Sequence, residues 1–332
     1  MAMSNADVPS LTATMAAIRG HAQVGLHFHP DRLDVSMTPV AEALLRDGVY
    51  RNQFETQLSN GKLSPVRGGD RDLWENELFG GAYAATEVTA AERPKYGALD
   101  LMRHPEGPCP RFGSCCLLLG AHMLESCTFT YMDSHQLPPE RGTIGEFDDI
   151  LAALLTESFQ REFALGRAGL RPPELLAHLR DALPLEQADP SGLPAARNLD
   201  HYIEAQVHGE ISLATDVDVL IADPSFQGTQ TGDVLQRLCQ QYGIRLHWHC
   251  GFALPAADVP GDFRGPDVQA LAKRVGLDGM VDAAAIGIAA ADLRSTPDAW
   301  RDFGTPDRAL QLMKLLWHVL VRYGNPKLPL PR

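Results

Sequence analysis

Residues 202–211 read Tyr-Ile-Glu-Ala-Gln-Val-His-Gly-Glu-Ile. Because successive side chains of a β-strand point to opposite faces, we expect Glu204, Gln206 and His208 to share one face of an entering strand. Their neighbours Val207 and Ile211 are apolar and are expected to be buried. A row of hydrogen-bonding groups beside such residues either faces bulk water or lines a cleft, and the second arrangement predicts a functional site.

The composition indicates an ordinary globular protein. The chain has 332 residues, of which 45% are hydrophobic and 21% are charged, and this length allows one large domain or two small ones. The net charge of -13 argues against a nucleic acid or an anionic membrane as a partner, because both require a basic surface. The six cysteines form no CxxC pair, which favours free thiols in a reducing compartment.

The chain predicts one folded domain with two irregular segments. Residues 1–22 are small and polar, and they lack the basic and apolar regions of a secretion signal, so we expect a flexible leader. A single domain is expected over residues 23–326. Residues 184–198 are rich in Pro, Gly and Ala, which indicates a surface linker or insertion within it. The longest apolar run, residues 280–291, is too short to span a bilayer.

The pattern of elements favours an α+β fold. Strands are predicted in separated groups, without the regular alternation with helices that a doubly wound sheet requires. The predicted strands are 24–28, 112–119, 127–131, 207–213, 217–222 and 245–249, and the main predicted helices are 147–163, 174–183, 232–242, 267–274 and 306–323. Walker, GxGxxG and GxSxG motifs are absent from the sequence, so phosphate loops and nucleophile elbows of those kinds are excluded.

The sequence Leu26-His27-Phe28-His29 ends a predicted strand with two histidines on the same face. Together with His247 and His249, these histidines could ligate a metal ion in a hydrolase. They could instead be hydrogen-bonded to the backbone at the strand end, or His27 could hold a ribose hydroxyl. The sequence leaves these three interpretations open.

Residues 50–61 are dense in hydrogen-bonding groups. Within them an arginine stands beside an aromatic residue, an arrangement that suits a dinucleotide because the guanidinium binds pyrophosphate while the ring stacks on a base. An ordinary solvated loop would have the same composition. Residues 93–97 and 111–114 are further clusters in which a basic residue, an aromatic residue and a glycine occur together, and each glycine permits close approach of a ligand.

Several segments together resemble a known bacterial family in the same order along residues 24–324. They are LHFHPDR, GVYRNQFET..SNG, GGDR..WE..LFGGAY, RPKYGAL, PRFGS, TFTYMDS, YIEAQVHG, DPSFQGT and LMKLLWHVLVRYG. The family was long described as a domain of unknown function. It includes the CteC-like effectors, which resemble ADP-ribosyltransferases and modify a threonine of host ubiquitin.

The resemblance implies an ADP-ribosyltransferase-like fold of split antiparallel β-sheets with added helices. It also implies NAD+ as co-substrate, no metal ion, and one catalytic glutamate after a central strand. Glu204 is the expected catalytic carboxylate. The usual order of the family motif would put it two residues later, where this chain has Gln206, so Glu210 remains the alternative.

The remaining motif residues follow from the same resemblance. Arg51 is the expected first-motif residue, with His27 as its competitor, and Ser114 with Phe112 fits the second motif, with Tyr96 as its competitor. The full set expected to contact NAD+ is His27, Tyr50, Arg51, Asn52, Gln53, Thr56, Tyr96, Phe112, Gly113, Ser114, Gln206 and His208.

The function that the resemblance implies is transfer of ADP-ribose from NAD+ to a protein hydroxyl, with a threonine of ubiquitin as the expected acceptor. Such an effector is made in the bacterial cytoplasm and exported into the host cytosol. Two other functions stay open from the residues: a metal-dependent hydrolase built on His27, His29, His247 and His249, and a binding module that has lost its activity.

Overall fold

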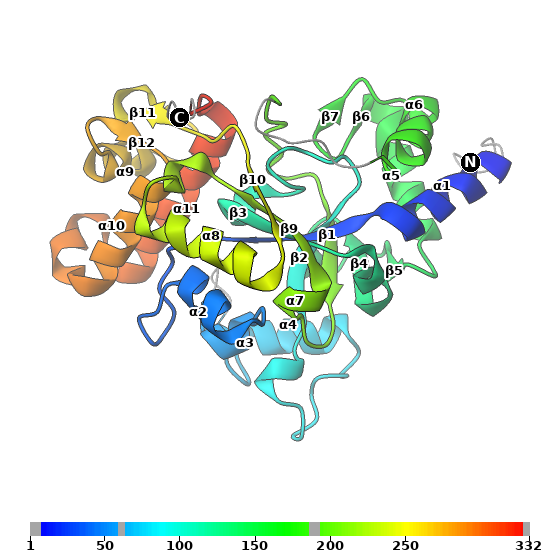
Figure 1. Cartoon of the computed structure of the whole chain (residues 1–332), viewed down its shortest axis with the longest axis horizontal. Coiled ribbons are helices and arrows are strands. Elements are labelled where there is room, and N and C mark those ends of the chain that lie inside the picture. The colour runs from blue at the N-terminus through cyan, green and yellow to red at the C-terminus, as the bar shows by residue number, and fades with distance from the viewer. Residues whose placement is uncertain (1–7, 59–63, 186–192, 328–332) are drawn as a thin grey trace.

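The computed structural model describes residues 8–58, 64–185 and 193–327, and within them eight strands form one sheet in the order β10-β9-β3-β1-β2-β8-β4-β5 (Figure 1). Neighbouring strands are antiparallel, except that β9 and β10 are parallel, so the sheet is mixed. The strands are β1 Gln23–Phe28, β2 Lys95–Asp100, β3 Cys115–Leu119, β4 Cys127–Tyr131, β5 Arg141–Thr143, β8 Ile203–Val207, β9 Val217–Ala222 and β10 Arg245–Trp248. Two short hairpins lie outside it, formed by β6 Phe163–Ala164 with β7 Arg167–Ala168 and by β11 Leu254–Pro255 with β12 Met280–Val281.

The helices gather in groups around this sheet, and Figure 1 shows α9, α10 and α11 at one end and α1, α5 and α6 at the other. Sheet and helices together confirm the expected α+β class. Among the described residues, no helix has the length and apolar character needed to cross a membrane. The α-helices are α1 Val8–His21, α2 Val40–Asp47, α3 Gln53–Thr56, α4 Asp70–Leu78, α5 Asp148–Arg161, α6 Pro172–Ala177, α7 Leu213–Asp216, α8 Gln230–Tyr242, α9 Asp267–Val275, α10 Ala283–Ser295 and α11 Pro306–Tyr323.

Local sequence explains where these elements begin and end. β3 has the sequence Cys-Cys-Leu-Leu-Leu and is buried at every position, as expected for a central strand that is covered on both faces. α8 begins where the Thr229 side chain accepts a hydrogen bond from the Gly232 amide, and it ends at Gly243 in the left-handed conformation. α11 begins in the same way at Thr305, with Pro306 at its first position.

One expectation about irregular segments is wrong for the residues that the structure describes. Residues 8–21 of the expected leader form α1, which packs against α6 and buries Thr14 and Ile18 completely, whereas residues 1–7 lie outside the described residues. The end of the expected linker is also fixed, because buried Asn198 donates hydrogen bonds to the carbonyls of Pro108 and His201. Residues 186–192 of that segment lie outside the described residues.

The strand predicted over residues 207–213 is displaced. β8 ends at Val207, and the chain then turns at Gly209, whose φ of 83° lies in the left-handed region that favours glycine. Ile211 and Leu213 are nevertheless fully buried from the following loop and α7. The apolar pattern therefore predicted burial correctly but not the strand.

The sheet opens in its middle, between β1 and β2. These strands pair only through Gln23–Asp100, Val24–Leu99 and Gly25–Ala98. Beyond these pairs β1 continues along β3 as far as Phe28, and β2 continues along β8. The second half of β1 and the first half of β2 therefore diverge, which leaves a gap within the sheet for side chains or a ligand.

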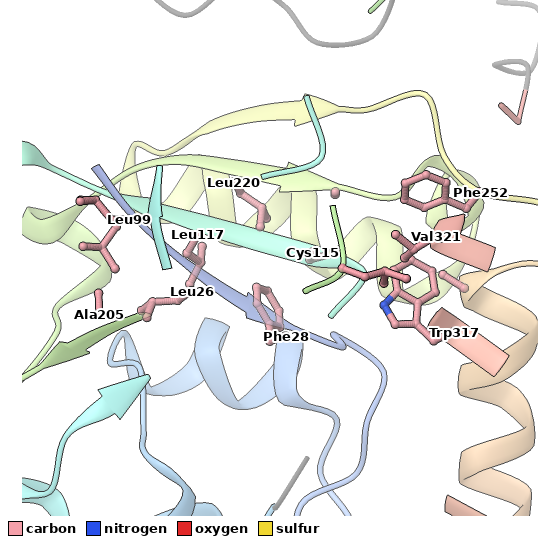
Figure 2. Close-up of a cluster of buried hydrophobic side chains, with 14 of the residues drawn as sticks. Leu26, Phe28, Leu99, Cys115, Leu117, Ala205, Leu220, Phe252, Trp317 and Val321 are labelled. Carbon is pink, nitrogen blue, oxygen red and sulfur yellow. The ribbon is translucent and has the colours of Figure 1, made fainter. Parts of the chain in front are cut away.

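The hydrophobic core joins the sheet to α11. Figure 2 shows Leu26 and Phe28 of β1 beside Leu117 of β3, with Trp317 and Val321 of α11 at the end of the same cluster. The Trp317 indole Nε1 also donates a 2.7 Å hydrogen bond to the Pro110 carbonyl, which satisfies its polar atom inside the core. This bond fixes the segment before β3 against α11.

Gly113 lies against the backbone of β1 at the open end of the sheet. A Cβ atom at this position would stand 2.3–2.4 Å from the backbone N, C and O atoms of Phe28. Because a backbone cannot move aside as a flexible side chain can, the close approach itself requires glycine here.

We predict that Gly113→Ala lowers the free energy of unfolding by about 1–3 kcal/mol or more, because the added methyl group overpacks the contact with Phe28. Gly20→Ala is the matched control. Gly20 is exposed on α1 with no heavy atom within 4 Å of the added Cβ, so its replacement should be neutral or stabilising by up to about 1 kcal/mol. Urea denaturation measures both, and equal stability of the two variants would contradict the contact.

Candidate functional site

A pocket of about 460 Å³ occupies the gap between β1 and β2. His27 and Phe28 line it from β1, and Tyr96 and Gly97 line it from β2. The segments that contribute the rest of the wall are 29–34, 40–58, 71–74, 109–112 and 133–135, together with Glu204 of β8 and Lys314 of α11. Residues far apart in the sequence therefore converge where the sheet opens.

Glu204 is the buried carboxyl group of this pocket. Its side chain is 7% exposed, and its Oε1 atom accepts hydrogen bonds from the Ser134 hydroxyl and, at 3.0 Å, from the Gln206 amide. Burial raises the pKa of Glu204 to about 7, an effect that the Ser134 hydrogen bond opposes and the nearby Asp133 carboxylate increases. The group therefore exchanges its proton near neutral pH.

Glu204, Gln206 and His208 do share one face of β8, as the alternation predicted. Gln206 accepts a 2.9 Å hydrogen bond from the Thr128 hydroxyl, and that oxygen lies 2.9 Å from Nε2 of His208. Nδ1 of His208 is in turn hydrogen-bonded to the Tyr83 hydroxyl. Since the Thr128 proton is directed to Gln206, the imidazole must carry its proton on Nε2.

Only Glu204 of this row reaches the pocket. Gln206 is 1% exposed and does not line it, and the ring of His208 is covered by Phe79 and Tyr83, at centroid distances of 5.4 and 6.0 Å. Burial, and secondarily Lys95, lowers the pKa of His208, so the neutral ring is favoured. Gln206 and His208 therefore lie outside this pocket, and the Gln206 amide holds Glu204 in position through its hydrogen bond.

The pocket that Glu204 lines also contains a buried arginine, Arg71, which the sequence motifs did not predict. Arg71 on α4 is 8% exposed and lines the pocket, and its guanidinium carbon lies 5.1 Å from the Trp74 ring and 5.2 Å from the Tyr96 ring. Its nearest carboxylate, Glu75, is 3.9 Å away and is held more closely by Arg93 at 3.0 Å. Arg71 is thus a partly compensated cation beside two aromatic rings, which suits an anionic ligand that also carries a planar group.

Arg51, the arginine expected from sequence, lies in a different environment. Its side chain is 47% exposed, and it forms ion pairs with Asp47 at 3.2 Å and with Glu55 at 3.4 Å. It lines the pocket from this paired position. The signal that distinguishes Arg71 from Arg51 is the spacing of Arg71, Trp74 and Glu75 on one helix, which places all three side chains on one face.

Two other residues expected to contact the ligand, Asn52 and His27, form hydrogen bonds that stabilise the fold. The Asn52 side chain accepts hydrogen bonds from the Phe54 and Glu55 amides at the start of α3, and it donates to the carbonyls of Ala90 and Arg93. His27 accepts a 3.1 Å hydrogen bond from the Cys109 amide at Nε2, and its Nδ1 lies 3.3 Å from the Gly113 carbonyl.

The His27 ring is therefore a neutral clamp between β1 and the segment before β3. Burial lowers its pKa to about 3, so the ring remains uncharged at physiological pH. Both nitrogens of His27 are hydrogen-bonded to backbone groups, as in the second of the three interpretations, whereas the hydrogen-bond partner of His29 is the Ser114 hydroxyl.

Nine of the expected site residues line the pocket and five do not. Those that line it are His27, Tyr50, Arg51, Asn52, Gln53, Thr56, Tyr96, Phe112 and Glu204. Those outside it are Gly113, Ser114, Gln206, His208 and Glu210. Ser114 is buried beside His29, at 3.3 Å between Oγ and Nδ1, and Glu210 is exposed in the loop after β8. The structure thus separates Glu204 from its alternative Glu210.

The model of a family described as a protein of unknown function, DUF3626, matches residues 23–323, which include every residue of this pocket. The chain belongs to the DUF3626 family. No curated protein matches it.

Burial lowers the pKa of His27 in this DUF3626 protein, and the neighbouring His249 lowers it further. Within residues 8–58, 64–185 and 193–327, no three His, Cys, Asp or Glu side chains stand close enough to hold a metal ion together. His249 accepts a hydrogen bond from the Gly251 amide at 3.0 Å, and burial lowers its pKa to about 4. The described residues thus provide no cluster of metal ligands for the hydrolase alternative built on His27, His29, His247 and His249.

We predict that Glu204→Gln changes the pH dependence of stability. The folded protein keeps a proton on Glu204 up to a pKa of about 7, whereas the unfolded chain releases it near 4.5, so the free energy of unfolding falls as the pH rises between these values. The glutamine variant keeps the shape and the two accepted hydrogen bonds but lacks this fall. Denaturation at pH 4.5 and pH 7.5 should show a difference between variant and wild type that grows by about 2–3 kcal/mol, and a constant difference would contradict the raised pKa.

Proposed function

We propose that this protein is an NAD+-dependent mono-ADP-ribosyltransferase that transfers ADP-ribose to a protein hydroxyl. The observation that carries the proposal is the position of Glu204, a buried carboxyl group in a pocket at the opening of the sheet, with Arg71 and aromatic rings in the same pocket. We further propose that the sheet has the split antiparallel arrangement of ADP-ribosyltransferases, which the short pairing of β1 with β2 supports.

The chemistry places one requirement on Glu204. Nicotinamide leaves the ribose as a neutral molecule when it takes the electron pair of the C1′–N bond, and an oxocarbenium-like ribosyl cation develops. An ionised carboxylate beside that cation stabilises it and can hold the ribose 2′-hydroxyl. The acceptor oxygen then bonds to C1′ and its proton passes to solvent or to a carboxylate, which completes the transfer.

The pocket walls suit the rest of a dinucleotide. Arg71 would bind the pyrophosphate, because its guanidinium is buried and incompletely compensated. Trp74, Tyr96 and Phe112 offer rings on which nicotinamide or adenine could stack. The Gln206 amide, on the same face of β8, would hold Glu204 in position.

The acceptor and the cellular setting follow from the resemblance alone. We propose a threonine of ubiquitin as acceptor, and export from the bacterial cytoplasm into a host cell as the route to it. Mass spectrometry of ubiquitin after incubation with the protein and NAD+ tests the acceptor. ADP-ribose on a threonine is the expected result. Nicotinamide release in the absence of modified ubiquitin would remove ubiquitin but keep the transferase class.

We predict that Glu204→Gln lowers the rate of nicotinamide release by about a hundredfold or more, because the variant cannot carry the charge that stabilises the ribosyl cation. The control is Glu210→Gln, which removes an exposed carboxylate outside the pocket and should leave the rate unchanged. Liquid chromatography of released nicotinamide measures both. Loss of activity in Glu210→Gln alone would move the catalytic role to Glu210, and unchanged activity in both variants would favour a different function.

We predict that Arg71→Gln weakens NAD+ binding by roughly ten- to hundredfold, the usual effect of losing one charge-assisted hydrogen bond. Arg51→Gln should weaken binding much less, because Asp47 and Glu55 already compensate that arginine. Isothermal titration calorimetry with NAD+ compares the two variants at equal ionic strength. The reverse order of effects would return the pyrophosphate to Arg51, as the sequence suggested.

A further inference from the structure

Two threonines of β4 flank the Gln206 amide, which in turn holds Glu204. Thr128 lies opposite Gln206 in the register of the sheet, and Thr130 lies opposite Glu204, so the four side chains share one face. The sequence motifs named neither threonine as a site residue. Both hydroxyl groups are hydrogen-bonded to the amide, and the two bonds run in opposite directions.

Thr128 is the donor of the pair. Its hydroxyl donates to Oε1 of Gln206 at 2.9 Å, and its oxygen lies 2.9 Å from Nε2 of His208. With the imidazole proton on Nε2, the Thr128 oxygen accepts from His208 and its own hydrogen is directed to Gln206. The oxygen end of the amide is therefore held on the side of Thr128.

Thr130 is the acceptor of the pair. Its hydroxyl donates to the Met132 carbonyl at 3.1 Å, which leaves its oxygen to accept. Nε2 of Gln206 donates to that oxygen at 3.3 Å and to Oε1 of Glu204 at 3.0 Å. An amide nitrogen has two hydrogens, so both are used.

This arrangement fits an amide in one orientation. A reversed amide would turn an oxygen toward the lone pairs of Thr130 and toward the carboxyl group of Glu204. A carboxylate at position 206 would do the same and would add a like charge. Because Gln206 is only 1% exposed, water cannot supply the missing hydrogen bonds, and the two threonines therefore decide which end of the amide Glu204 meets.

We propose that Thr128 and Thr130 are positioning residues that keep the NH2 group of Gln206 turned toward Glu204. A donor in this place stabilises the ionised carboxyl group, which is the form that a developing ribosyl cation needs. This link to the reaction rests on the proposed function, whereas the orientation of the amide does not.

Other groups also influence the ionisation of Glu204. The Asp133 carboxylate raises its pKa, and the hydrogen bond from Ser134 lowers it. Further groups near it or in the same pocket are Tyr96, Tyr202, Cys109 and Arg71. Burial raises the pKa of the two phenols and of the thiol, so these three are neutral at pH 7. A threonine substitution leaves all of these groups in place, so a comparison between variants isolates the effect of the amide.

The first experiment measures the pKa of Glu204 and needs no catalytic activity. Carbon-13 NMR of labelled glutamate side chains follows the titration, and Glu204→Gln identifies the signal by its loss. Thr128→Val and Thr130→Val each remove one hydroxyl from a side chain of similar size. Each should raise the pKa of Glu204 by roughly one pH unit, because the amide can then turn its oxygen to the carboxyl group.

Conservative variants separate the hydroxyl from packing. Thr128→Ser and Thr130→Ser keep the hydroxyl and should restore the wild-type pKa. Thr143→Val is the matched control, because Thr143 pairs with Thr128 from β5 but is exposed, and its replacement should cause no shift.

Thermal unfolding identifies a variant that does not fold, and the corresponding Thr→Ala variant then removes the same hydroxyl with a smaller side chain. An unchanged pKa of Glu204 in a folded variant that lacks the hydroxyl would overturn the proposal for that threonine. A shift of equal size in the serine variants would also overturn it, since the effect would then come from packing of the methyl group.

A second experiment follows nicotinamide release from NAD+ between pH 5 and pH 9. The valine variants should lose rate at low pH and approach the wild-type rate at high pH, with the rising limb moved by the same interval as the pKa. A loss of rate that is equal at every pH would contradict the positioning role. A shifted pKa in a protein that releases no nicotinamide at any pH would refute the transferase function and leave the orientation of the amide standing.

Discussion

The early end of the pairing between β1 and β2 is the constraint on which the site depends. After Gly25–Ala98 the two strands take different partners, and the sheet can no longer fill the space between them with backbone hydrogen bonds. The groups facing this space must be satisfied by other means. His27 is one such means, because its ring bonds the segment 109–113 to β1, and Gly113 allows that segment to approach the Phe28 backbone.

Glu204 is a carboxyl group that the fold buries, although burial makes its charged form less stable. Its burial raises the pKa, and the donors that surround it are neutral: the Ser134 hydroxyl and the Gln206 amide. Neutral donors orient the group and favour its charged form only in part, so its pKa stays near neutrality. A fully compensating arginine at the same place would ionise the group at lower pH.

Sequence patterns predicted those features of the fold that depend on residues close together in the chain. The apolar runs of β1 and β9 and the common face of Glu204, Gln206 and His208 follow from local periodicity. The end of β8 was missed because the burial of Ile211 and Leu213 resembles a strand pattern, although a glycine turn intervenes.

The part of the site that could not be predicted depends on tertiary contacts. Arg71 meets Tyr96 only because α4 packs beside β2, and no local pattern reports that contact. The same reason explains why Arg51, which stands in a motif-like context, was preferred to it. The helix over residues 8–21 was missed because its composition is that of a frayed terminus, whereas its stability comes from packing on α6.

The hydrogen bonds from Tyr83 to Glu204 all run in one direction. The phenol donates to the imidazole, the imidazole to the Thr128 hydroxyl, that hydroxyl to Gln206, and the Gln206 amide to the carboxyl group. Because the Thr128 hydroxyl donates to Gln206, a flip of the Gln206 amide requires the imidazole to change tautomer, and the Tyr83 hydroxyl would then accept from Nδ1 instead of donating to it. The face that Gln206 presents to Glu204 is therefore coupled to the tautomer of His208, a ring that does not touch the carboxyl group.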